Sequence, residues 1–151
     1  MKSSLQITNK YKEICTTGNI NEFDNIIHPD FERFSDGKTQ KGLQELKDII
    51  IWTRTINSNL TVIGVEDIVT EDKVITRIEV SGVFNLTNKP WKARGVSIYQ
   101  IKENRLYRQW VELDALGAFM QAGMALMPTG KVLLQFLKNY KKYGTKLKEY
   151  A

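Results

Sequence analysis

The residues best suited to chemistry in this chain are carboxylates that stand beside large apolar side chains. Asp114 follows Trp110 and Leu113 at the end of an apolar segment, and Glu112 and Glu79 are further carboxylates within such segments. A carboxylate that loses solvent beside apolar groups becomes a better base near neutral pH. These residues predict proton transfer, with Asp114 as the first candidate for the base.

Asp114 also has a structural interpretation. It stands directly before the segment ALGAF, and an aspartate at that position can accept a hydrogen bond from the free N–H groups that begin a helix. The sequence leaves the catalytic role and the capping role open.

Large apolar side chains are the candidates for binding a substrate. Trp52, Trp91 and Trp110 could form an aromatic wall for a flat ligand, although tryptophans in a small sheet protein also serve as core residues. Trp110 is the preferred pocket residue, and Phe34 is a further candidate for binding the substrate. Met120 could shape an adaptable apolar pocket, although its spacing to the following methionines also fits a buried helix face.

Several other chemistries lack the residues that they require. The single cysteine, Cys15, excludes a disulfide within the chain and a zinc cluster, and we expect a buried, inert thiol. The glycines show no phosphate-binding spacing, and no set of serine, cysteine and histidine indicates a covalent nucleophile. The only histidine, His28, lies far from the segment that contains Asp114.

Helical spacing and capping residues predict three helices in the first part of the chain. The first helix covers residues 4–16, with Ser3 and Ser4 as caps. Asn21 begins a short second helix that contains Phe23, Ile26 and Ile27 and stops at Pro29. A turn at Asp36-Gly37 follows an extended segment, and the third helix covers residues 43–56.

The next fifty residues predict a sheet of antiparallel hairpins. Four segments rich in β-branched and aromatic residues, at about 60–69, 73–85, 91–102 and 105–113, are joined by short turns. Period-two alternation places Val74, Ile78, Val80 and Phe84 on one face and Arg77, Glu79 and Ser81 on the other. In the last segment Leu106, Arg108, Trp110, Glu112 and Asp114 share one side, a mixture typical of a pocket or a dimer face.

This order of elements predicts an α+β fold, in which a cone-shaped curved antiparallel sheet is covered by three N-terminal helices over a pocket. We expect one domain at residues 1–127 and, at residues 128–151, a basic amphipathic helix as an extension of it. The net charge of +5 comes from this extension, because residues 131–151 contain six lysines and one glutamate. We expect the extension to dock on protein, while a nucleic acid or an anionic membrane surface is the alternative partner.

The stretch from Lys92 to Gly123 resembles the SnoaL-like polyketide cyclases, within the nuclear-transport-factor-2-like superfamily. The resemblance rests on an Arg-Gly-Val strand entry, a Trp-x-x-x-Asp strand end and a following Leu-Gly, Met-Gln and Gly; these are Arg94, Gly95, Trp110, Asp114, Leu116, Gly117, Met120, Gln121 and Gly123. It implies an intramolecular aldol condensation without metal or cofactor, a homodimer, and Asp114 as the acid–base residue. An enolate then needs stabilisation, for which Arg94 is the best placed by motif, with Arg77 and Tyr99 as alternatives.

Two functions of different class follow from the sequence. The first is a cofactor-free enzyme that abstracts a proton next to a carbonyl on a hydrophobic substrate, and the second is a non-catalytic protein that binds a lipid, a steroid-like compound or an aromatic ligand. An interaction module that uses the basic helix is a third reading. We expect no nucleic-acid partner, and because no apolar stretch is long enough for a signal peptide or a membrane span, we expect a cytoplasmic protein.

Overall fold

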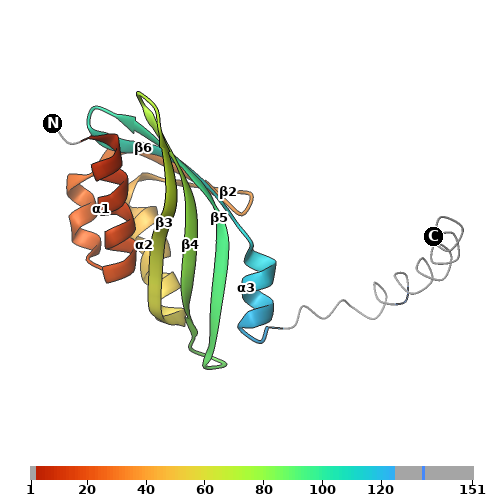
Figure 1. The fold of residues 1–151 in the computed structure, drawn as a ribbon. Helices are drawn as coiled ribbons and strands as arrows, with labels where there is room; N and C mark the ends of the chain where they lie inside the picture. Colours follow the sequence, from red (N-terminus) through yellow and green to blue (C-terminus); the bar gives the residue numbers. More distant parts are fainter. Residues whose placement is uncertain (1–2, 125–133, 135–151) are drawn as a thin grey trace, which may run out of the picture.

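The structure is a computed structural model that describes residues 3–124 and Leu134. Its helices and strands form the predicted α+β fold (Figure 1). Apart from Leu134, the extension predicted at residues 128–151 lies outside the described residues, so the domain boundary at 127 stays a prediction.

One curved sheet of six strands organises the described residues. The strands are β1 (Ile27–Ser35), β2 (Lys38–Lys41), β3 (Asn57–Val69), β4 (Lys73–Phe84), β5 (Lys89–Lys102) and β6 (Arg105–Leu113), in the order β2-β1-β6-β5-β4-β3. The four predicted strands correspond to β3 through β6. One expectation needs correction, because β1 pairs with β6 in parallel and the sheet is therefore mixed. The sheet ends at β2 and β3 and does not close into a barrel.

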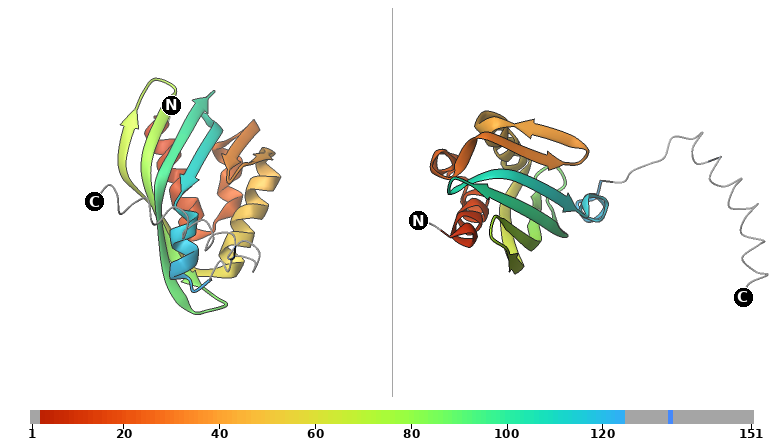
Figure 2. Two further views of the ribbon diagram at one scale, coloured as in Figure 1. Left: turned by 90° about the vertical axis from the view of Figure 1, so that its right-hand side faces the viewer. Right: turned by 90° about the horizontal axis from the view of Figure 1, so that it is seen from above.

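The helices occupy two places around this sheet. The helices α1 (Ser4–Thr17) and α2 (Gly42–Ile56) pack on one side of it, and the short α3 (Ala115–Gln121) lies beside β5 (Figures 1 and 2). A capping box begins α1, since the Ser3 hydroxyl accepts from the Gln6 N–H and the Gln6 side chain accepts from the Ser3 N–H. This confirms the predicted serine cap.

The predicted second helix is shorter than expected. The chain forms a 3-10 helix, η1, at Ile20–Asn25, and Ile27 already belongs to β1. Pro29 therefore lies inside a strand and does not end a helix. The strand tolerates this proline because its pairing with β6 is irregular between Ile27 and Glu32, where the missing N–H breaks no regular rung of the ladder.

Alternation along the strands separates an inner face, which the helices α1 and α2 cover, from an outer face. Cross-strand pairs assign Val74, Thr76, Ile78, Val80, Ala93, Gly95, Ser97, Tyr99, Gln109, Val111 and Leu113 to the inner face. The predicted alternation of β4 is confirmed. At Gly95 the backbones approach so closely that a Cβ atom would lie 1.9 Å from the Glu112 carbonyl oxygen, so only glycine fits there.

The predicted side of the last strand is wrong at Leu106. Gln100 pairs with Arg108 while Ile101 pairs with Leu106, so β6 contains one extra residue at Tyr107. This bulge turns Leu106 to the inner side, where it is fully buried, while Arg108 and Trp110 stay on the outer face.

A buried hydrogen-bonded chain joins α1 to the centre of the inner face. The Tyr11 hydroxyl donates to Gln109 Oε1 at 2.8 Å, and Gln109 Nε2 donates to the Ser97 hydroxyl at 3.0 Å. The Tyr11 ring also packs edge-on against Tyr99, with ring centroids 5.7 Å apart. These polar contacts fix how α1 sits on the sheet, because a buried amide left unpaired is costly.

Replacing Tyr11 with phenylalanine tests this anchor. The variant leaves Gln109 Oε1 buried without its donor, so we expect the free energy of unfolding to fall by about 1–3 kcal/mol, measured by urea denaturation. Tyr107→Phe is the matched control, since the Tyr107 hydroxyl has no hydrogen bond among the described residues, and its change should stay within about 0.5 kcal/mol. Equal effects of the two variants would show that the Tyr11 hydroxyl does not anchor α1.

Candidate functional site

A cavity of about 190 Å³ lies between α2, the inner face of the sheet and α3. The inner face and α2 contribute Trp52, Ile56, Phe84, Trp91, Ala93 and Leu113 to its wall. The other side consists of Ala115, Ala118 and Phe119 of α3, with Ala122 and Met124 just beyond the helix. A cavity with such a wall suits a flat, apolar compound.

Few polar groups reach this cavity. Thr53, Asn57 and Asp36 are the polar residues in its lining. Asn57 is engaged within the protein, because its Nδ2 donates to the Thr53 carbonyl and its Oδ1 accepts from the Trp91 indole N–H at 2.7 Å. The Thr53 hydroxyl donates to the Ile49 carbonyl. Asp36 is therefore the only charged side chain in the described lining.

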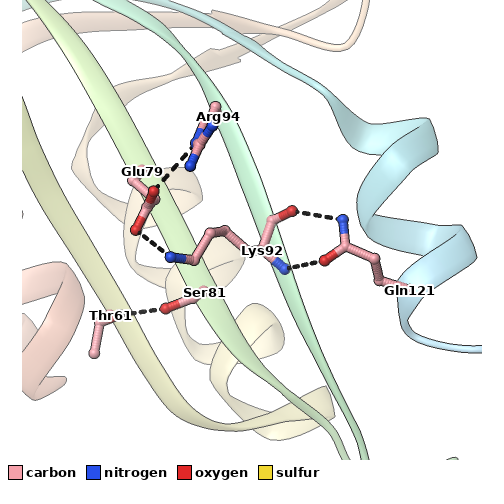
Figure 3. A network of polar contacts seen from close by, with 6 residues as sticks. All are labelled: Thr61, Glu79, Ser81, Lys92, Arg94 and Gln121. Atoms are coloured by element: carbon pink, nitrogen blue, oxygen red, sulfur yellow. Dashed lines mark hydrogen bonds and ion pairs between the residues drawn. The ribbon is translucent and has the colours of Figure 1, made fainter.

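The position of α3 depends on hydrogen bonds to an open sheet edge. Because β6 ends at Leu113, opposite Gly95, the earlier residues of β5 have no strand partner on that side. The Asp114 N–H donates to the Arg94 carbonyl, and the Gln121 side-chain amide both accepts from the Lys92 N–H and donates to the Lys92 carbonyl, each at 3.0 Å (Figure 3). Gln121 thus supplies the rung that a strand residue would supply.

Asp114 lies at the start of α3, at the rim of the cavity. Its carboxylate Oδ1 accepts from the Gly117 N–H at 2.9 Å, so it caps the helix as the structural interpretation predicted. The side chain is exposed and does not line the cavity, but both of its neighbours in the chain, Leu113 and Ala115, do. Asp114 therefore caps α3 and also lies next to the cavity.

Of the predicted binding residues, Trp52 and Trp91 line the cavity from opposite elements, α2 and β5. The Trp91 indole is held by Asn57, whereas Trp52 is 61% exposed and forms an open part of the wall. Met120 points away from the cavity, since it is 66% exposed on α3 and is not part of the lining.

The outer face carries Arg94 and Glu79. Glu79 pairs with the Lys92 ammonium at 2.7 Å and with Arg94 Nε at 3.3 Å, beside the hydrogen-bonded hydroxyls of Thr61 and Ser81 (Figure 3). The hydrogen bond from Lys92 is the main reason that the pKa of Glu79 is lowered; loss of solvent opposes it, and the hydrogen bond from Arg94 adds a smaller lowering. This ion-pair group lies across the sheet from the cavity.

Glu112, Trp110 and Phe34 also belong to the outer face. Trp110 and Phe34 stack on each other from the paired strands β6 and β1, with ring centroids 5.4 Å apart and planes inclined by 12°. The sequence interpretation grouped Trp110 and Glu112 with Asp114 by parity, but the strand ends at Leu113 and only the rim around Asp114 meets the cavity.

The buried reactive groups of the chain lie in the core. Tyr99 is 1% exposed and burial raises its pKa well above the usual value, so it remains a neutral core residue on the inner face. Burial raises the pKa of the Cys15 thiol to about 12, in agreement with an inert cysteine. His28 is buried at the opposite end of β1 from Asp36, where its Nδ1 accepts from the Asp30 N–H.

Residues 3–124 contain no group of three histidine, cysteine or acidic side chains that could hold a metal ion. Within the same part of the chain, no helix combines the length and the apolar character needed to cross a membrane. The predicted cytoplasmic location stays a prediction.

The fold and the cavity can now be compared with known proteins. The family model of the SnoaL-like polyketide cyclases matches residues 5–122. The chain belongs to this family. Its match spans α1 through α3 and therefore includes every element that surrounds the cavity. No curated protein matches the chain.

Solved structures agree with this assignment at the level of the fold. TsrD from Streptomyces laurentii superposes with a TM-score of 0.73 at 18% identity, covering 80% of this chain and 95% of the other. A SnoaL-like polyketide cyclase from Agrobacterium tumefaciens gives a TM-score of 0.68 at 14% identity, with coverages of 80% and 98%. A protein from Acidithiobacillus ferrooxidans, put forward as a polyketide cyclase, gives 0.69 at 21% identity, with coverages of 83% and 99%.

The role of Gln121 in holding α3 can be tested by amide hydrogen exchange. Gln121→Leu removes the acceptor of the Lys92 N–H, so we expect this amide to exchange about tenfold faster, as measured by NMR. Gln121→Glu is the matched variant, because it keeps a carbonyl-type acceptor and should retain most of the protection at Lys92. Unchanged exchange in Gln121→Leu would mean that α3 is held without this side chain.

Proposed function

We propose that this chain binds a hydrophobic carbonyl compound in the cavity between α2 and α3 and transforms it by cofactor-free acid–base chemistry, either an aldol-type cyclisation or an isomerisation. The family assignment supports a small-molecule cyclase or isomerase. The observation that carries the proposal is the apolar cavity, whose wall at Leu113 and Ala115 continues directly into Asp114 at the rim.

In this proposal Asp114 removes the proton next to the carbonyl group of the bound substrate. Its hydrogen bond from the Gly117 N–H fixes the position of the carboxylate, and one oxygen is left to accept the proton. The walls around Trp52 and Trp91 hold the substrate and limit the access of water. Arg94 and Glu112, predicted as catalytic partners, lie on the outer face and receive no role in this cavity.

A specific observation favours the second function, binding without catalysis. Asp114 is exposed and its carboxylate already serves as the cap of α3, which is a sufficient structural reason for an aspartate at this position. In that case the cavity holds a lipid-like, steroid-like or aromatic ligand by contact with its apolar wall. The two functions use the same ligand site and differ only in whether Asp114 removes a proton from the ligand.

Exchange of α-protons separates these two functions without knowledge of the natural substrate. The probe is 2-tetralone in deuterated buffer, followed by proton NMR, and we expect the protein to accelerate deuterium uptake next to the carbonyl. Asp114→Asn keeps a helix-capping oxygen but removes the base, so the acceleration should fall at least about 100-fold, to near the buffer rate.

Asp30→Asn is the control, since this exposed carboxylate lies on β1 away from the cavity, and it should retain the full acceleration. An Asp114→Asn variant that exchanges as fast as the unaltered protein would remove Asp114 from the mechanism. A protein that binds 2-tetralone without accelerating exchange would support the binding function.

We further propose that the chain forms a homodimer through its outer face. Ile63 and Ile68 of β3 and Val96 of β5 are between 43% and 59% exposed on this face, and the Phe34–Trp110 stack lies on the same face at β1 and β6. Charged groups of both signs lie among them, including the pairs of Glu79 with Lys92 and Arg94, so two copies of the face can complement each other.

The effect of a charge at Val96 tests the dimer. We expect light scattering after gel filtration to give the mass of two chains for the unaltered protein and of one chain for Val96→Glu, because association would have to bury an added carboxylate next to Glu112. Leu86→Glu is the matched control on the β4–β5 turn, where Leu86 is 85% exposed, and it should remain dimeric. A monomeric unaltered protein would contradict the proposal.

A further inference from the structure

The charge pattern of the cavity indicates which ligands it can select. Its described lining contains four aromatic residues, Trp52, Phe84, Trp91 and Phe119, and one charged residue, the exposed Asp36, while no lysine, arginine or histidine belongs to it. Aromatic faces and a carboxylate both attract a cation.

Asp36 does not need its charge to form the turn that it occupies. It connects β1 to β2 with Gly37, and both residues have positive φ, 53° and 70°. Asparagine adopts this conformation as readily as aspartate, and Asn-Gly is the preferred pair in such hairpins. The Ser35 hydroxyl donates to Asp36 Oδ2 at 2.9 Å, a bond that an amide oxygen could also accept. The carboxylate therefore calls for an explanation other than the turn.

The parallel pairing of β1 and β6 places Asp36 at the same end of the sheet as the proposed base. Asp36 directly follows β1 and Asp114 directly follows β6, and neighbouring parallel strands end at the same edge. The opposite end of the cavity differs in charge, because the Lys89 ammonium lies against Gly123, next to Met124 in the lining. The end of the cavity at Asp36 is thus the anionic one.

We infer that the ligand of this cavity is an apolar, flat compound that carries a cationic nitrogen, a protonated amine or a quaternary ammonium group, and that Asp36 selects it. The inference rests on the proposed use of the cavity as the ligand site and adds the chemical class of the ligand. Asp36 acts as a specificity residue in contact with the cation, whereas the apolar remainder of the ligand packs between Trp52 and Trp91.

A pair of probes of equal shape tests the selection. Benzyltrimethylammonium and neopentylbenzene differ by the replacement of the quaternary nitrogen with carbon, and their binding can be followed through the fluorescence of the tryptophans. We expect the unaltered protein to bind the cation about tenfold more tightly than the neutral probe, and Asp36→Asn to lose most of this preference while its affinity for the neutral probe stays within about twofold.

Glu71→Gln is the charge-matched control, because it removes an exposed carboxylate on the turn between β3 and β4, outside the described lining, and it should keep the full preference. If both probes bind equally to the unaltered protein, or if Asp36→Asn keeps the preference, the inference is wrong and the cavity is still a ligand site. If neither probe binds, both the inference and the proposed use of the cavity fail.

Discussion

The structure depends on the requirement that α1 and α2 cover one face of a single curved sheet. Once Tyr11 of α1 reaches Gln109 and Tyr99, the inner face of β5 and β6 is fixed, and alternation assigns the other residues of these strands, with one interruption at the Tyr107 bulge. The same constraint sends Arg94, Glu112 and Trp110 to the outer face. It thereby separates an apolar cavity on one side of the sheet from an ion-paired surface on the other.

The cavity exists because β5 continues past the point where β6 ends. The last strand ends at Leu113, earlier than its neighbour β5, and α3 fills the resulting edge through the Asp114 N–H and the Gln121 amide. Small side chains in α3 and at its C-cap, Ala115, Ala118 and Ala122, leave space between the helix and the sheet. One short helix thus closes the cavity and carries the proposed base at its first turn.

The sequence predicted the strands from β3 to β6 and the helices α1 and α2 well, because their periodicity and turn residues are local signals. It missed the parallel pairing of β1 with β6, since pairing between distant segments leaves no local pattern, and the bulge at Tyr107 reversed the predicted side of Leu106. At the candidate site, Trp52, Trp91 and Asp114 lie at or beside the cavity, whereas Asp36 was read only as a turn residue. The turn at Asp36-Gly37 accounts for this residue from the local sequence, and only the fold brings Asp36 to the cavity wall.

The most direct test of the central claim is to map where a neutral aromatic ligand binds. The measurement is the change in amide and indole chemical shifts of the labelled protein on titration with 2-naphthol. The account predicts changes clustered at Trp52, Trp91, Leu113 and the residues of α3, with the Trp110 indole unaffected. Changes clustered instead around Trp110, Phe34 and Arg94 would place the ligand site on the outer face and contradict it.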